Sequence, residues 1–205
     1  MLGFLSRWLS GGNPTLGWTA SAAAPLVVDL DKAALGGVRL GETIEGLRFL
    51  GQGAWRKLPS ICWRKEGAPR GTLDYPERGL SLDVSDGKLE GIVLFAAANA
   101  RKGISPFGGR IRFGGMETDF ARLATEKRIL DMLGEPWWRD EDEDEVLLFY
   151  ELGDVEWQVE IDKTGAVAAL LVVSPPLMED AEQRAAYGVT KPWPPEPASR
   201  TQPEE

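Results

Sequence analysis

The sequence predicts an α+β fold in which two helix-plus-three-stranded-meander repeats form one antiparallel sheet with the helices on one face. Three observations lead to this prediction. Apolar residues alternate with polar ones at Leu80, Leu82 and Val84, as in a half-buried strand. Asp86-Gly87 follows, and this dipeptide between apolar runs is a strong hairpin signal. The same order of elements then recurs later in the chain.

The first unit is predicted over residues 25–100. It begins with a short strand at 26–30 and a short helix at 43–50, which Gly51 ends. A meander follows. Its three predicted strands span 71–75, 80–84 and 89–95.

The second unit is predicted over residues 117–176. Its helix spans 118–133 and stops at Gly134, just before Pro136. Three predicted strands follow it, at 146–151, 155–161 and 167–173. When the units are aligned, Leu82 and Trp157 occupy equivalent inner positions, so both are predicted to be buried.

Three further segments complete the predicted organisation. Residues 1–24 combine an N-terminal amphipathic segment with a linker, and Gly11-Gly12-Asn13-Pro14 ends the apolar pattern before a membrane-spanning length is reached. Residues 101–116 form a Gly-rich basic connector. Residues 177–205 are predicted to form a short helix and a Pro-rich acidic tail without regular structure.

Composition excludes several classes of function. A formal net charge of −9 opposes binding to nucleic acid, because phosphate contacts need a basic face. Cys62 is the single cysteine, so no intramolecular disulfide can form, and a cytoplasmic location is expected. The chain has no histidine, which removes Ser-His-Asp catalysis and histidine metal sites. No catalytic motif, cofactor site or metal site is predicted.

The candidate partner-binding site is a stretch that joins two tryptophans to a run of six carboxylates. Aromatic anchors ringed by charge are typical of interface hot spots. Two other interpretations stay open, a solvated loop and a hard-cation site, although the run lacks the ligand spacing of an EF-hand loop. The residues of the candidate site are Trp137, Trp138, Asp140, Glu141, Asp142, Glu143, Asp144 and Glu145.

A secondary set of candidates consists of basic residues of the connector and of tryptophans in predicted loops. The basic connector either binds an anion or faces the acidic run within the same molecule, and the sequence does not separate these alternatives. For each tryptophan taken singly, packing within the protein is the simpler expectation. The secondary candidates are Arg101, Lys102, Arg110, Arg112, Trp55 and Trp63.

Two stretches carry a resemblance to known domains. They are Val38-Arg-Leu-Gly-Glu-Thr-Ile-Glu-Gly-Leu and Gly79-Leu-Ser-Leu-Asp-Val-Ser-Asp-Gly-Lys-Leu-Glu-Gly-Ile92. This pattern resembles the helix-plus-meander unit of β-lactamase-inhibitory-protein-like and small outer-membrane-lipoprotein-type domains. The resemblance implies a concave sheet face that binds another protein, often to inhibit it, and no catalytic residues.

These observations together favour a protein-binding module, an inhibitor or immunity-type protein that occludes a partner with a basic surface. The first alternative is a structural subunit that holds a multiprotein complex together. The second is a metal-dependent enzyme built on Asp and Glu side chains. The partner and the oligomeric state stay open.

Overall fold

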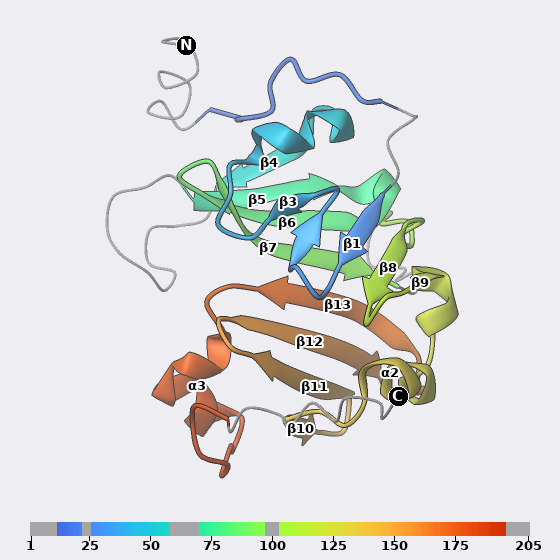
Figure 1. Cartoon of the computed structure of the whole chain (residues 1–205), viewed down its shortest axis with the longest axis vertical. Coiled ribbons are helices and arrows are strands. Elements are labelled where there is room, and N and C mark those ends of the chain that lie inside the picture. Colours follow the sequence, from blue (N-terminus) through green and yellow to red (C-terminus); the bar gives the residue numbers. More distant parts are fainter. Residues whose placement is uncertain (1–11, 22–25, 58–69, 97–102, 196–205) are drawn as a thin grey trace.

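The computed structural model describes residues 12–21, 26–57, 70–96 and 103–195, which form two β-sheets with a few short helical segments (Figure 1). Within these ranges, no helix is long and apolar enough to cross a membrane. The N-terminal amphipathic segment expected over residues 1–9 lies outside the described part of the chain.

The larger sheet has eight strands in the order β10-β11-β12-β13-β7-β6-β5-β4, and all neighbours are antiparallel. Each half of the chain supplies four strands. The halves meet at the pair β7 and β13, where Leu94 lies opposite Leu170. The strands are β4 (Ala54–Lys57), β5 (Arg70–Tyr75), β6 (Leu80–Ser85), β7 (Lys88–Phe95), β10 (Trp138–Glu141), β11 (Glu145–Leu152), β12 (Val155–Asp162) and β13 (Val167–Val173).

The turn between β6 and β7 confirms the hairpin predicted from Asp86-Gly87. Asp86 has φ 47° and Gly87 has φ 72°. Positive φ at both central residues is the geometry of a type I′ turn, whose twist matches that of the flanking strands.

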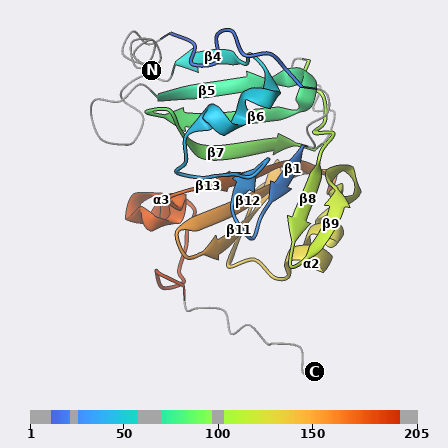
Figure 2. The same ribbon diagram turned by 45° about the horizontal axis from the view of Figure 1, so that its top comes forward.

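The smaller sheet has five strands in the order β3-β2-β1-β8-β9 (Figure 2). Only β1 and β8 among them pair in parallel. Val28 and Ile111, which are partners in this parallel pair, are completely buried in the core shared with the larger sheet. The strands are β1 (Val27–Asp29), β2 (Ala34–Leu35), β3 (Val38–Arg39), β8 (Arg110–Phe113) and β9 (Met116–Asp119).

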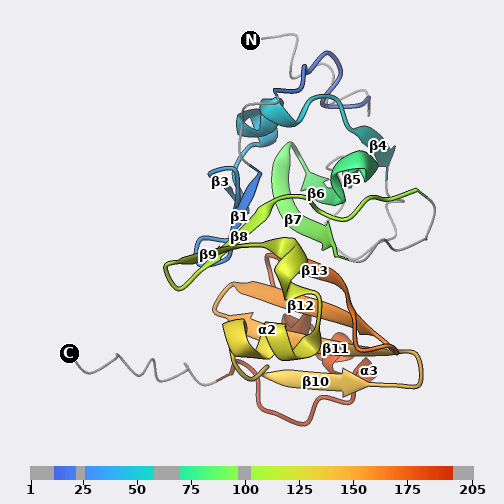
Figure 3. The ribbon, with the colours of Figure 1, turned by 90° about the vertical axis from the view of Figure 1, so that its right-hand side faces the viewer.

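The helical segments lie on both faces of the larger sheet (Figure 3). On the core side, Ile129 of α2 is fully buried in the main cluster. On the other side, the ring of Tyr187 contacts Phe149 of β11 with centroids 5.1 Å apart. The segments are η1 (Ile44–Leu50), η2 (Pro76–Arg78), η3 (Phe120–Leu123), α2 (Glu126–Leu133), η4 (Leu177–Glu179) and α3 (Ala181–Ala186).

Alternation along the strands places the core as expected. Leu82 is fully buried and Trp157 is 2 % exposed, which confirms the predicted burial of both residues. Their strand neighbours two residues away point to the same side, because successive side chains of a strand alternate between faces.

The predicted fold class is nevertheless wrong. The structure is mostly β, with two sheets instead of one, and each half adds an edge strand, β4 or β10, to its expected three. The first expected helix is a 3-10 segment, η1, and the helical segments do not share one face. The strand near residue 28, expected in the first unit, instead pairs with a strand of the basic connector in the smaller sheet. Alternation predicts that a segment is a strand but does not say which strand is its partner.

Candidate functional site

The acidic run forms a β-hairpin at one edge of the larger sheet. β10 pairs with β11, and Glu141 lies opposite Val146 next to the turn. Asp142 closes that turn, because its Oδ1 accepts the backbone N–H groups of Asp144 at 2.8 Å and of Glu145 at 3.0 Å. These two hydrogen bonds lower the pKa of Asp142. We call residues 138–152 the acidic hairpin.

Two of the six carboxylates are engaged within the acidic hairpin. Asp142 caps the turn, and Glu141 pairs with Arg139 at 3.0 Å. Arg139 also pairs with Glu126 at the start of α2. Among the described residues, no cation pairs with the four remaining carboxylates, which belong to Asp140, Glu143, Asp144 and Glu145.

Two of these carboxylates, those of Asp140 and Glu145, also affect the neighbouring C-terminal segment electrostatically. Burial raises the pKa of the Tyr187 phenol, and the charges of Asp140, Glu145 and Glu156 raise it further. Glu143 and Asp144 are exposed at the tip of the turn. The tip therefore carries a negative field that the described part of the protein does not neutralise.

Trp137 and Trp138 are half-buried and pack against the C-terminal segment. The Trp138 Nε1–H donates to the carbonyl of Tyr187 at 3.2 Å. The Trp137 ring meets Trp193 edge to face, with centroids 5.7 Å apart and planes at 78°. The Lys191 ammonium donates to the carbonyl of Trp137 at 2.5 Å. Both tryptophans thus hold residues 187–193 against β10, and only part of each ring faces solvent.

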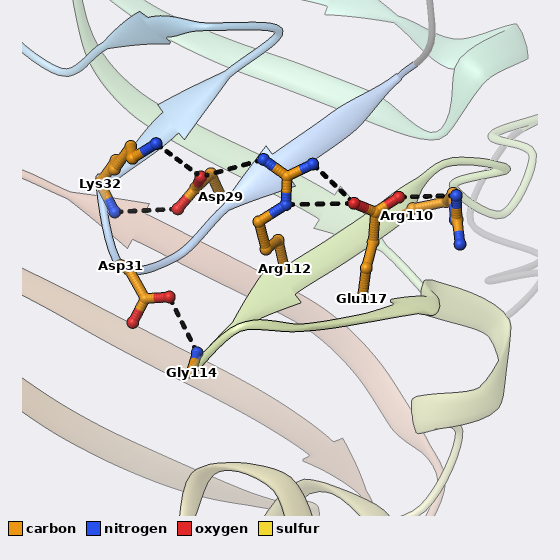
Figure 4. A network of polar contacts seen from close by, with 7 residues as sticks. All are labelled: Asp29, Asp31, Lys32, Arg110, Arg112, Gly114 and Glu117. Atoms are coloured by element: carbon orange, nitrogen blue, oxygen red, sulfur yellow. Dashed lines mark hydrogen bonds and ion pairs between the residues drawn. The ribbon is translucent and has the colours of Figure 1, made fainter.

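The secondary candidates do not join the acidic hairpin. Arg110 and Arg112 lie on β8, where Arg112 pairs with Glu117 at 2.6 Å and with Asp29 at 3.5 Å (Figure 4). Arg110 pairs with the same Glu117 at 2.6 Å. These arginines therefore tie β1, β8 and β9 together within the smaller sheet.

Trp55 lies on β4, at the edge of the larger sheet opposite to β10. It is half-buried, and its cross-strand partner is Leu73 of β5. Arg101, Lys102 and Trp63 lie outside the described residues, as does Cys62. The described secondary candidates thus occupy separate places in the fold.

A buried pair of carboxyl groups is a feature that the sequence reasoning missed. Glu151 and Glu156 are cross-strand partners on β11 and β12. Glu156 is fully buried and accepts the backbone N–H of Met178 at 2.9 Å. Burial, and then the charge of Glu156, raise the pKa of Glu151 to about 9. The signal was present in the sequence, because both residues stand equally far from the Gly153-Asp154 turn.

This pair of carboxyl groups lies against a C-terminal segment of the same chain. The raised pKa of Glu151 favours its protonated form beside Glu156, and Glu156 holds η4 through the Met178 N–H. Arg184 of α3 donates to the carbonyls of Met178 at 2.6 Å and Glu179 at 2.9 Å. Glu156 and Arg184 therefore anchor the segment that covers the base of the acidic hairpin.

The acidic side chains that the structure describes do not form a cluster that would hold a cation. Within the described ranges, no group of three or more Asp, Glu, Cys or His side chains could hold a metal ion. The carboxylates of the acidic hairpin therefore do not converge on one point.

No protein-family model matches the sequence, and no curated protein matches it. A crystal structure of YjgB, a DUF4309 family protein from Bacillus subtilis subsp. subtilis str. 168, is similar over 67 % of this chain and 82 % of that chain. The sequences are 14 % identical and the TM-score is 0.37. A likeness at this level identifies neither the fold nor the function of this chain.

Proposed function

We propose that the protein binds a partner protein with a basic surface and occludes it, as an inhibitor or immunity-type protein does. The observation that carries the proposal is the cluster of unpaired carboxylates on the acidic hairpin. Other acidic side chains of the described residues, such as Glu90 and Glu117, are paired with arginines. The acidic hairpin brings together four carboxylates that have no ion-pair partner among the described residues.

Mutual repulsion among these carboxylates costs the isolated fold some free energy, because like charges on adjacent residues raise each other's energy. In a complex with a basic partner, the same carboxylates would contribute favourably to the free energy of binding. Long-range attraction would speed the encounter, and salt would weaken it, since the Debye length is about 8 Å at physiological ionic strength. The partner would then contact the exposed part of Trp138 at the base of the hairpin.

The test is a comparison of two triple variants with the same change in net charge. The hairpin variant is Asp140→Asn, Glu143→Gln and Asp144→Asn, which leaves Asp142 in place to cap the turn. The matched control is Glu77→Gln, Asp86→Asn and Asp131→Asn, three exposed acids elsewhere. A partner captured by the unaltered protein and by the control, but not by the hairpin variant, is the expected result.

Association and dissociation rates with that partner then separate the two contributions. The hairpin variant should lower the association rate and flatten its dependence on salt, because it removes the steering charge. Trp138→Ala should raise the dissociation rate about tenfold if the lost contact contributes about 1.4 kcal/mol. Unchanged rates in both variants would reject the acidic hairpin as the contact surface.

The activity of the captured partner distinguishes occlusion from assembly. An occluding protein abolishes the activity of its partner at a simple stoichiometry. A structural subunit would leave that activity intact and would build a larger complex, which light scattering would detect. This second result would replace the inhibitor proposal by the assembly alternative.

A further inference from the structure

A cavity of about 440 Å³ lies between the two sheets, at the end of β11 opposite to the acidic turn. The turn between β1 and β2 and the end of β3 line one side of it. The turn between β11 and β12 lines the other. The volume falls in the range of small-molecule sites, about 300–1,000 Å³. None of the candidate residues of the acidic hairpin lines this cavity.

The wall formed by the smaller sheet is held in place by contacts between its turns (Figure 4). Asp31 accepts the backbone N–H of Gly114 at 2.8 Å, which joins the β1–β2 turn to the β8–β9 turn. The Leu30 N–H donates to the carbonyl of Arg112 at 2.9 Å. Ala33, also in the wall, has φ 46°, a left-handed conformation that is uncommon for alanine. The wall is therefore preorganised before any ligand arrives.

Aromatic and aliphatic side chains line the inner part of the cavity, beside polar ones. Trp157 of β12 and Phe113 of β8 both line it, and their rings meet edge to face with centroids 5.2 Å apart and planes at 87°. Half-buried Leu40 and Val155, and Leu152, which is 40 % exposed, extend this surface. Such a surface favours an apolar group, because its transfer from water releases about 25 cal/mol per Å² of buried area.

The rim of the cavity carries charges of both signs. Lys32 is paired with Asp29 at 3.6 Å. By contrast, Arg39 on β3 and Asp154 in the β11–β12 turn are exposed. In the described part of the chain, neither of these two side chains has a partner in an ion pair or a hydrogen bond. The cavity thus offers one unpaired cation from the smaller sheet and one unpaired anion from the larger sheet.

We propose that this cavity binds a small zwitterion with an apolar body, of the class of free α-amino acids with aromatic or branched side chains. The carboxylate of the ligand pairs with Arg39 and its ammonium pairs with Asp154. The apolar side chain of the ligand rests on Phe113, Val155 and Leu152, which are not fully buried. Binding at this cavity is independent of partner binding at the acidic hairpin, because the two sites lie at opposite ends of β11.

Isothermal titration calorimetry with phenylalanine, leucine and glycine tests the apolar requirement. Phenylalanine amide and N-acetylphenylalanine test the two charges, since the first lacks the carboxylate and the second lacks the ammonium. Phenylalanine amide also resembles the N-terminal residue of a peptide, and N-acetylphenylalanine resembles the C-terminal residue. Phenylalanine and leucine should bind, glycine should not, and each modified form should bind about fivefold or more weakly than phenylalanine.

Two substitutions on the rim test which residue binds each charge of the ligand. Arg39→Gln should remove the preference for phenylalanine over its amide, and Asp154→Asn should remove the preference over the N-acetyl form. Arg122→Gln and Asp131→Asn are controls at residues that do not line the cavity and should preserve both preferences. The proposal is overturned if phenylalanine and leucine show no heat of binding up to about 10 mM, a concentration that corresponds to very weak affinity. Equal preferences in rim and control variants, or equal binding of either modified form, also overturn it.

Discussion

The buried side chain of Trp157 packs against residues of both sheets. It is 2 % exposed, packs edge to face on Phe113, and lies 6.2 Å from the ring of Tyr150. Its Nε1–H is buried without an acceptor among the described residues. Its contribution to stability therefore comes from packing and not from a hydrogen bond.

Trp157→Ala is expected to lower the free energy of unfolding by about 3–5 kcal/mol, as large aromatic truncations in cores do. Trp157→Phe should cost less, because it keeps a ring in the site and removes the unpaired N–H. Urea denaturation measures both values. Trp55→Ala, at a half-buried edge position, is the control, and an equal loss in Trp55→Ala and Trp157→Ala would contradict the assigned role.

The raised pKa of Glu151 should make the folded protein less stable as pH rises. The folded-state pKa is about 9, and an unfolded glutamate titrates near about 4.3. Between these values the folded state holds the extra proton, so the free energy of unfolding falls as pH rises through this window. The stabilisation from the Glu151 proton is fully present at a pH below the pKa of the unfolded state. It is lost at a pH above the pKa of the folded state.

Glu151→Gln should therefore flatten the decline of stability between about pH 5 and pH 9, because glutamine cannot ionise beside Glu156. Denaturation midpoints across this range measure the slope. Glu143→Gln, at the exposed tip of the acidic hairpin, should keep the slope of the unaltered protein. A Glu151→Gln slope equal to that of the control would show that Glu151 is not protonated in the fold.

At the scale of elements, the C-terminal segment and the acidic hairpin behave as one unit. The segment is attached through the Met178 N–H, the carbonyl of Tyr187 and the ring of Trp193. It also packs through Tyr187 on Phe149, the cross-strand partner of Trp138. The segment therefore covers one face of β10 and β11.

Removal of residues 177–205 should speed amide hydrogen exchange in β10 and increase quenching of tryptophan fluorescence by iodide. The physical reason is that Trp137, Trp138 and Phe149 lose the groups that cover them. Glu77→Gln, at an exposed position outside this segment, is the control and should change neither measurement. Tyr187→Ala should give a smaller change in the same direction. Unaltered exchange in β10 after the longer deletion would contradict the covering role.

At the scale of the whole molecule, the seam between β7 and β13 makes the two halves of the chain interdependent. Ile92 lies opposite Val172, and Leu94 lies opposite Leu170, with all four side chains fully buried. The core cluster continues across this seam and into the smaller sheet. The two halves therefore share one continuous buried core.

The molecule is therefore expected to unfold in a single transition. Far-ultraviolet and near-ultraviolet circular dichroism should give coincident curves in urea, and Leu170→Ala at the seam should shift both curves together by about 2–5 kcal/mol. Leu152→Ala, at an exposed position, should leave the curves close to those of the unaltered protein. Two separate transitions would show that the halves fold independently.

The sequence by itself determined the strands of the two meanders and which side of them is buried. The predicted strands of both meanders are present, the Asp86-Gly87 turn has the expected geometry, and Leu82 and Trp157 are buried as alternation predicts. It also placed the candidate residues 137–145 in one hairpin-sized segment. These features are local, because they depend on the period of side chains along a strand and on the conformation of two-residue turns.

Only the tertiary structure decided which strands pair and which charges remain unpaired. β1 and β8 are far apart in the sequence, and their parallel pairing creates the second sheet that the sequence reasoning did not anticipate. The same pairing neutralises Arg112 with Asp29 and forms the wall of the cavity. The physical reason is that backbone hydrogen bonds are the same for every strand, so partners are selected by burial of side chains that come together only in the folded chain.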